Sequence, residues 1–259
     1  MAILIKQASS EHDEAITDLF TEAQIPIKPL FWERAFSAEA PGETASSPMI
    51  AISELGELLA FVAARPCTLR IETTRVRAQI LHDLVVRTGP MERETLGMLM
   101  KDVSLMADVS IMAGAGLEAT RFADMAHMQL AGFFDRYYLD WSTPVPDKSP
   151  EPLAIKRAGT IPERLAVLDD ELEAEHRIFR GRPVERLEWQ FRGPAKNFEV
   201  YVAEEEPAYF VLRREKARRE NETELQLVDF CCPRSLAGPF LRAIADHARG
   251  LEKSLFATA

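Results

Sequence analysis

The sequence is poor in cysteine and has no long apolar run. Only Cys67, Cys231 and Cys232 occur among 259 residues. The adjacent pair does not easily bridge to itself, so no disulfide framework is expected and a reducing cytoplasm is the predicted location. No apolar run approaches membrane-spanning length. The short apolar stretch at the N-terminus is soon followed by Glu11 and Asp13, which does not fit a secretory signal.

Basic residues are in the minority. The chain has 31 Lys and Arg against 41 Asp and Glu, with a formal net charge of −10 and a pI near 5.1. A nucleic-acid surface needs clustered basic side chains in excess, so no nucleic-acid partner is expected, and without a spanning segment no membrane partner is expected either. With 47% hydrophobic residues the chain can bury a substantial core, and its length suits two domains.

In the first half of the chain, stretches with apolar residues at the spacing typical of strands are interspersed with stretches that have the spacing typical of helices. We expect helices at residues 11–22, 31–36, from 92 onward and at 117–130, and strands at residues 3–7, 49–54, 57–68, 79–86, 109–113 and 133–141. The dipeptide Leu55-Gly56 and the polar tip at residues 72–74 predict two hairpin turns.

A proline-rich stretch at residues 142–152 is the best candidate for a linker, because it carries four prolines among mostly polar residues. The pattern after it repeats the order of the first half, with strands, helices and a second tryptophan in corresponding places. This predicts two copies of one domain, at residues 1–141 and 153–259. The second copy lacks a counterpart of residues 117–141, so either the natural chain continues or something else covers the missing edge.

The most informative stretch is the apolar strand at residues 79–86, which ends at Gly89-Pro90 before a helix that begins near Glu92. Such a strand-to-helix turn presents the free N–H groups of the first helical turn and can bind an anion. However, Glu92 and Glu94 lie in that turn, where they would repel a phosphate.

Two short motifs connect this region to a known family. The strand Asp83-Leu84-Val85-Val86 and the later Leu130-Ala131-Gly132-Phe133 resemble the GNAT acetyltransferase superfamily. The resemblance covers about the first 140 residues; the second half is similar only in the order of its elements, with Leu227-Val228-Asp229-Phe230 in the corresponding strand. It implies an α/β fold in which helices flank a mixed, mostly antiparallel sheet, in two tandem copies of which the second is abbreviated.

The resemblance also implies a function, the transfer of an acyl group to a small-molecule or protein amine. Acetyl-CoA or another acyl-CoA is the implied co-substrate, an acyl-carrier protein is a further candidate donor, no metal is expected, and a homodimer is left open. Asp83 and His82 are candidate bases. The family's acid position is held by Met128, which leaves His127 and Tyr138 as candidates. The implied acyl-CoA contacts are Leu84, Val85, Val86, Arg87, Gly89, Gly114 and Gly116.

The sequence departs from this family where the acyl-CoA pyrophosphate should bind. The positions of the family's Arg-x-x-Gly-x-Gly/Ala loop hold Met91, Glu92 and either Glu94 or Leu96, and a carboxylate there opposes phosphate binding. The alternative is therefore a GNAT-like fold kept for binding or assembly without catalysis. In that case Asp83 bonds neighbouring backbone and His82 is a partly buried polar residue.

Two further patterns allow other readings. Residues 114–119 fit the dinucleotide-binding form G-x-G-x-x-A, but the further strand and helix units of such a fold are missing, so Gly114 and Gly116 are better explained by a tight turn lining an acyl or pantetheine cleft. Glu173 and His176 lie three residues apart in a predicted helix, where a solvated acidic face is favoured over a metal site.

Overall fold

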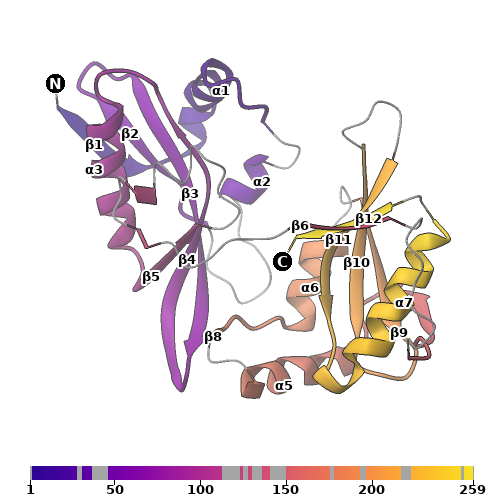
Figure 1. Ribbon diagram of the computed structural model, residues 1–259. Coiled ribbons are helices and arrows are strands. Elements are labelled where there is room, and N and C mark those ends of the chain that lie inside the picture. Colours follow the sequence, from indigo (N-terminus) through magenta and orange to yellow (C-terminus); the bar gives the residue numbers. More distant parts are fainter. Residues whose placement is uncertain are drawn as a thin grey trace. The chain divides into compact units, whose positions relative to one another are not determined.

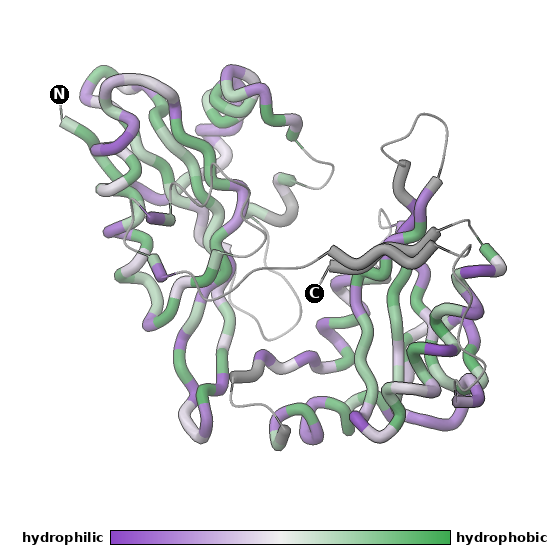
Figure 2. The backbone as a smooth tube through the Cα atoms, viewed as in Figure 1, coloured by the Kyte–Doolittle hydropathy of each residue, from purple (hydrophilic) through white to green (hydrophobic). Residues whose placement is uncertain are grey.

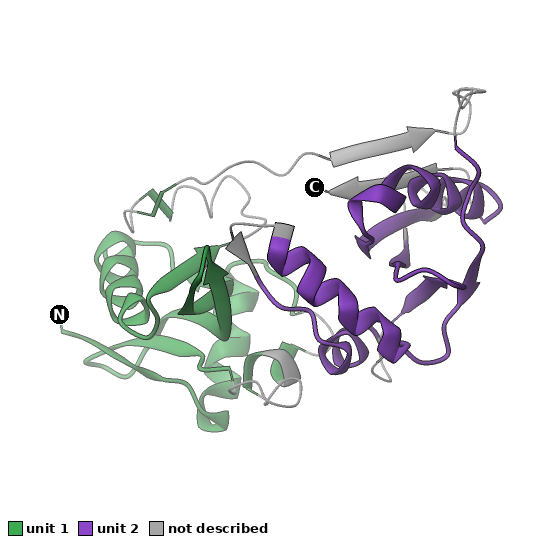
Figure 3. Cartoon of the chain, turned by 90° about the horizontal axis from the view of Figure 1, so that it is seen from below, with its two compact units in different colours: residues 1–132 green, residues 133–259 purple. Residues whose placement is uncertain are grey.

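The computed structural model describes residues 2–27, 31–36, 46–112, 123–124, 128–129, 136–140, 150–175, 178–192, 197–216, 223–251 and 254–258. The chain divides into two compact units, residues 1–132 and 133–259 (Figure 3). None of the helices described has the length and apolar character needed to cross a membrane. Each unit has its own sheet and its own core.

The sheet of the first unit has the order β1-β2-β3-β4-β5 (Figure 1). Neighbours among the first four strands are antiparallel, and β5 is parallel to β4. The strands are β1 (Ile3–Gln7), β2 (Met49–Ser53), β3 (Leu58–Ile71), β4 (Thr74–Val86) and β5 (Val109–Met112). Both expected hairpin turns are present, with positive φ values of 84° at Gly56 and 55° at Glu72.

Helices cover both faces of this sheet, and each face has its own core. On one face lie η1 (Ser10–His12), α1 (Asp13–Glu22) and α2 (Phe31–Phe36), whose buried Phe20 and Phe31 pack with Phe61 of β3. On the other face lies α3 (Glu92–Ser104), which buries Leu96 and Leu99 at helical spacing. Figure 2 shows hydrophobic residues concentrated along the central strands, while the helices alternate in hydropathy.

The second unit repeats this arrangement. Its sheet has the order β6-β12-β11-β10-β9-β7, and β12 is parallel to β11 as β5 is to β4. The strands of this sheet are β6 (Arg136–Asp140), β7 (Ile155–Arg157), β9 (Phe198–Ala203), β10 (Tyr209–Lys216), β11 (Thr223–Cys231) and β12 (Ser254–Thr258). The short β8 (Ile178–Phe179) precedes α6 in the sequence and is not part of this sheet. The helical segments are η2 (Glu163–Ala166), α5 (Val167–Glu175), α6 (Val184–Arg192), η3 (Arg234–Leu236) and α7 (Ala237–Arg249).

The helices of the second unit also pack on two faces. Leu168 of α5 and Leu187 of α6 belong to one core with Val211 of β10, and Phe240 and Ile244 of α7 belong to the other. The predicted fold class, helices flanking a mixed and mostly antiparallel sheet, is confirmed. That the two units are copies of one domain stays a prediction, supported by their shared strand order.

Strand β6 differs from the sequence-based expectation. Residues 133–141 are expected to close the first domain, whereas β6 pairs antiparallel with β12 of the second unit, from Arg136 opposite Thr258 to Asp140 opposite Ser254. Without β6, the outer edge of β12 would leave its backbone N–H and C=O groups unpaired. The edge expected to need a cover in the second copy is thus covered by a strand from earlier in the chain.

Candidate functional site

The ladder of β4 is interrupted in its second half. The register between β3 and β4 shifts between Phe61 and Ala63, which face Val85 and His82 respectively. Asp83 lies inside this irregularity with a φ of 53°. A bulge of this kind leaves an extra residue outside the regular ladder and turns the strand locally, and aspartate tolerates the left-handed conformation better than most residues. The bulge therefore gives the Asp83 region a backbone geometry different from the rest of the sheet.

The other edge of β4 pairs with β5 over the first half of this region. Its parallel pairing with β5 runs from Ala78 opposite Val109 to Leu81 opposite Met112. No residue of the described β5 pairs with β4 beyond Leu81. From His82 onward, β4 has an irregular ladder with β3. Backbone N–H groups in such a segment are candidates for binding a ligand oxygen.

The two candidate bases on β4 are in contact. His82 Nδ1 lies 2.8 Å from Asp83 Oδ2, and the side chains are 21% and 27% exposed. With the proton on Nδ1, the carboxylate accepts this hydrogen bond and Nε2 keeps a free lone pair. Nε2 is buried and has no hydrogen-bond partner among the described residues. His82 lies opposite Ala63, whose side chain belongs to the core under α1 and α2, so the imidazole lies on that face of the sheet.

The side chains of the apolar residues after Asp83 pack in the two cores of the first unit. Val85 is 3% exposed in the core under α1 and α2, and Val86 is 6% exposed in the core under α3. Leu84 is partly buried against the α3 core. Only the backbone of these three residues is therefore suited to the predicted donor contact.

The turn after β4 has free space around Gly89, and its arginine, Arg87, forms an ion pair. The Arg87 guanidinium lies 3.2 Å from a carboxylate oxygen of Glu22, and the backbone N–H of Arg87 donates to Leu59 O at 2.7 Å. Gly89 has a φ of 151°, a region that favours glycine, and a Cβ built on it would meet nothing within 4 Å. The first turn of α3 carries Glu92 and Glu94, as the sequence indicates.

The remaining predicted site residues lie either outside the described residues or on another strand. His127, Gly114 and Gly116 lie outside the described residues. Tyr138 lies on β6, opposite Phe256 of β12 in the second unit, and its side chain is outside the described part. In the stretches that the structure describes, no group of histidine, cysteine and acidic residues could hold a metal ion.

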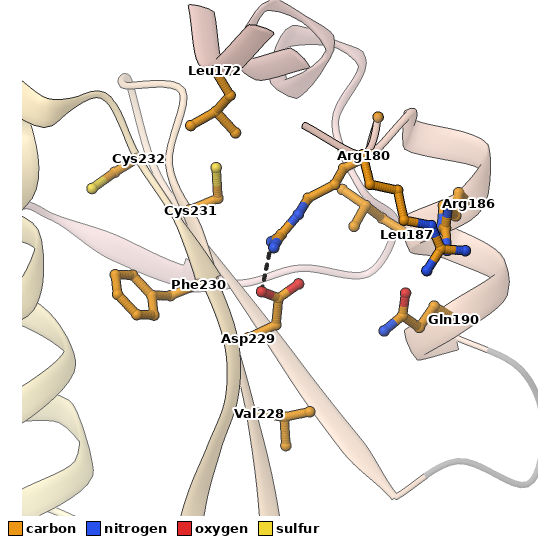
Figure 4. Close-up of a pocket in the computed structure, with 12 residues that line it drawn as sticks. Leu172, Arg180, Arg186, Leu187, Gln190, Val228, Asp229, Phe230, Cys231 and Cys232 are labelled. Carbon is orange, nitrogen blue, oxygen red and sulfur yellow. Dashed lines mark hydrogen bonds and ion pairs between the residues drawn. The ribbon is translucent and has the colours of Figure 1, made fainter. Parts of the chain in front are cut away.

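The second unit has a cavity that the sequence does not predict. The register between β10 and β11 shifts between Val211 and Leu212, and β11 pairs with β12 only from Leu225 to Leu227. Beside this irregularity lies a cavity of about 610 Å³, in which β11 faces α6 (Figure 4). It is lined by Leu172, Arg180, Gly181, Arg182, Arg186, Leu187, Gln190, Val228, Asp229, Phe230, Cys231 and Cys232.

An ion pair fixes one wall of this cavity. Arg182 Nη1 donates to Asp229 Oδ1 at 2.7 Å and to the Tyr209 hydroxyl at 3.2 Å, and that hydroxyl donates to Asp229 Oδ2 at 3.0 Å. The backbone N–H of Arg182 donates to Asp169 Oδ1 at 2.6 Å. Burial and the neighbouring Asp229 raise the pKa of Tyr209. Asp229 is therefore engaged in a structural network, unlike Asp83, whose partner is a histidine.

The sequence contains a cluster of arginines that contributes to this cavity, but the cluster alone does not predict it. Arg180, Arg182 and Arg186 fall within seven residues of a strongly acidic chain, but which carboxylate they meet depends on β11, 47 residues away from Arg182. A spacing pattern does not reveal such a long-range pair.

We expect Cys231 to resist alkylation in the native protein. It is 6% exposed, and burial raises the pKa of its thiol to about 12. Because the thiolate is the nucleophile, Cys231 should hold about three orders of magnitude less thiolate at pH 8 than an ordinary cysteine. Iodoacetamide labelling followed by peptide mass spectrometry should find it unmodified in native protein and modified in guanidinium chloride. Equal labelling rates in both conditions would contradict this.

Comparisons with known proteins find similarity in structure but not in sequence. No family model and no curated protein matches the sequence. Among solved structures, the chain is similar to a GCN5-related N-acetyltransferase from Anabaena variabilis, with a TM-score of 0.69, 11% identity and coverage of 100% of this chain and 66% of that one. It is also similar to a probable N-acyltransferase from Enterococcus faecalis, with a TM-score of 0.67, 12% identity and coverage of 100% and 65%.

A third similar structure is an N-myristoyltransferase from Saccharomyces cerevisiae with bound myristoyl-CoA. Its TM-score is 0.57 at 13% identity, with coverage of 99% of this chain and 72% of that one. The chain spans slightly less than two thirds of the length of the first two structures. Strand order, flanking helices and these similarities agree, and the chain has the fold of the GCN5-related N-acetyltransferases.

Proposed function

We propose that the first unit transfers an acyl group from an acyl thioester to an amine. The observation that carries this proposal is the coincidence on β4 of a bulge at Asp83 and a His82–Asp83 contact of 2.8 Å. Similar solved structures include proteins described as N-acetyltransferase, probable N-acyltransferase and N-myristoyltransferase with bound myristoyl-CoA, which supports the same chemistry.

In the proposed reaction the amine attacks the thioester carbonyl, a C–N bond forms and the C–S bond breaks. His82 Nε2 takes the proton that the amine loses, and Asp83 holds the imidazole with Nδ1 protonated. Backbone N–H groups of residues 84–86 stabilise the oxyanion that forms on the carbonyl oxygen. The leaving thiolate then takes up the proton from the His82 imidazolium, which restores the neutral imidazole.

The phosphate groups of free CoA are expected to be repelled at the start of α3. Glu92 and Glu94 stand at the start of α3, where a carboxylate about 5 Å from a phosphate costs on the order of 3 kcal/mol at an effective dielectric near 20. A carrier-bound thioester presents a single phosphodiester instead of a pyrophosphate and a 3′-phosphate, so an acyl-carrier protein fits this entrance better. The same two acids favour the alternative, a fold kept for binding without catalysis.

Binding and turnover of acyl thioesters test the proposal. Acetyl-CoA, octanoyl-CoA and myristoyl-CoA at millimolar concentration should raise the Tm of the full chain, because a ligand that binds only the native state stabilises it by mass action. Thiol release, followed with a thiol reagent, should then depend on an added amine from a panel of small amines and lysine peptides. Pantetheine thioesters serve as the donor without CoA's charge. If no thioester raises the Tm and no amine accelerates thiol release, the non-catalytic alternative stands.

A further inference from the structure

The cavity of the second unit is cationic in an acidic protein. Its lining contains three arginines, Arg180, Arg182 and Arg186, against the single carboxylate of Asp229, while the whole chain carries a net charge of −10. Arg182 is neutralised by Asp229 at 2.7 Å. Arg180 lies on the same cavity, on the side formed by α6 and the segment before it (Figure 4).

Arg180 has donors that the described residues do not satisfy. Its Nε and Nη2 atoms are buried and have no hydrogen-bond partner within the described part of the chain. A buried donor without a partner costs free energy, and a guanidinium presents its N–H groups in a fork that matches carboxylate and phosphate oxygens. An oxyanion placed against Arg180 would supply both the missing acceptors and the missing negative charge.

The rest of the lining is apolar. Leu172, Leu187 and Val228 lie on the cavity wall with Gln190 as a neutral polar neighbour. The volume of about 610 Å³ is within the range of sites for small organic ligands and much larger than an inorganic ion needs. A ligand that fills it must have an apolar body as well as a charged head.

We propose that this cavity binds a small organic anion, with its carboxylate or phosphate group on Arg180 and its apolar body against Leu172, Leu187 and Val228. The proposal does not depend on acyl transfer by the first unit. An aliphatic amine is protonated to an ammonium ion near neutral pH and is repelled by the Arg180 guanidinium, and Asp229 is held by Arg182 and Tyr209. The cavity is thus suited to a ligand other than the amine substrate.

Calorimetric titration of the full chain tests the site with defined probes. We expect 4-phenylbutyrate or 4-phenylbutyl phosphate to bind at least tenfold more tightly than the neutral 4-phenylbutanamide, and the tighter of the two anions identifies the head group. Inorganic phosphate should bind at least tenfold more weakly than the tighter organic anion. Equal affinity of the amide and both anions, or phosphate binding as tightly as they do, would overturn the proposal.

Substitutions assign the binding to Arg180. Arg180→Gln should weaken the preferred anion at least tenfold, and Arg180→Lys, which keeps the charge but not the fork, should weaken it less. Arg242→Gln is the matched control, because Arg242 lies on α7 at the other face of the sheet and pairs with Asp246 at 2.7 Å. The Arg182 network is left intact in all three variants, and Arg180 donates to no described residue through Nε or Nη2, so the Tm should stay within about 2 °C of wild type.

The acyl-CoA experiment separates this proposal from the proposed function. Arg180→Gln should leave any thioester-induced rise in Tm unchanged. Anion binding that is the same in Arg180→Gln, Arg180→Lys and wild type would overturn the site, whatever the outcome for acyl transfer. Loss of anion binding in Arg180→Gln with a native Tm supports it even if no thioester binds.

Discussion

Replacing His82 by glutamine is expected to lower kcat for acyl transfer by about a hundredfold to ten-thousandfold, the range of general acid–base catalysis. The amide of glutamine fills a similar space but does not take up the proton that the amine loses. In the proposed reaction the thioester is bound by the backbone of β4 and the turn at Gly89, so the rise in Tm with acyl-CoA and the KM for the donor should change less than threefold. Steady-state kinetics of thiol release and thermal shift measure the two effects separately.

Two further variants make this prediction specific. Asp83→Asn removes the carboxylate that holds His82 at 2.8 Å, and we expect it to lower kcat by about ten- to a hundredfold, since a positioning residue contributes less than the base itself. Asp108→Asn is the matched control, because Asp108 pairs with Arg77 at 3.2 Å on an exposed part of the same unit. Its turnover should equal that of wild type. If His82→Gln keeps at least half of the wild-type kcat, His82 is not the base.

Replacing Phe61 by alanine is expected to lower the free energy of unfolding by about 4 kcal/mol, as for other buried aromatic residues truncated to alanine. Phe61 is 0% exposed, and its ring centroid lies 5.8 Å from that of Phe20 and 5.6 Å from that of Phe31. Removing the ring leaves a cavity between β3 and the helices α1 and α2. Urea unfolding followed by circular dichroism should show the loss as a lower midpoint.

Phe61→Leu is the control for this prediction. Leucine keeps most of the apolar volume, so the loss should be about 1 kcal/mol. Phe61 also lies opposite Val85, next to the bulge in β4, so the alanine variant should lose thioester binding at temperatures where the first unit begins to unfold. A loss below about 1 kcal/mol in Phe61→Ala would show that the helices close over the space.

The local elements follow from the sequence. Apolar residues at helical spacing predicted α3 with Leu96 and Leu99 inward, and both residues are 0% exposed. Leu55-Gly56 predicted a hairpin, and Gly56 has the positive φ of 84° that its turn needs. His82 and Asp83 were candidates because the resemblance to the GNAT acetyltransferase superfamily implies a base on or near the central strands. Signals of this kind depend on residues a few positions apart, so a pattern is enough to find them.

The pairing of strands that are far apart in the chain could not be predicted from such local patterns. The sheet that β6 joins depends on which edge is free once the chain has folded, because a strand's apolar pattern is the same for either sheet. Likewise, the bulge at Asp83 is defined by the register against β3, and β3 residues Phe61 and Ala63 show no sign of it in their sequence.

The sequence by itself determined the order of elements and the position of the acidic turn before α3, since each depends on local propensity and periodicity. The fold class followed from the resemblance of two short motifs to the GNAT acetyltransferase superfamily. Only the tertiary structure decided that β4 has a bulge at Asp83, that β6 covers β12, and that Arg182 meets Asp229 beside an arginine-lined cavity. These features come from strand register and from contacts between residues far apart in the chain, where the free energy of packing the whole unit selects one pairing among several that the local sequence allows.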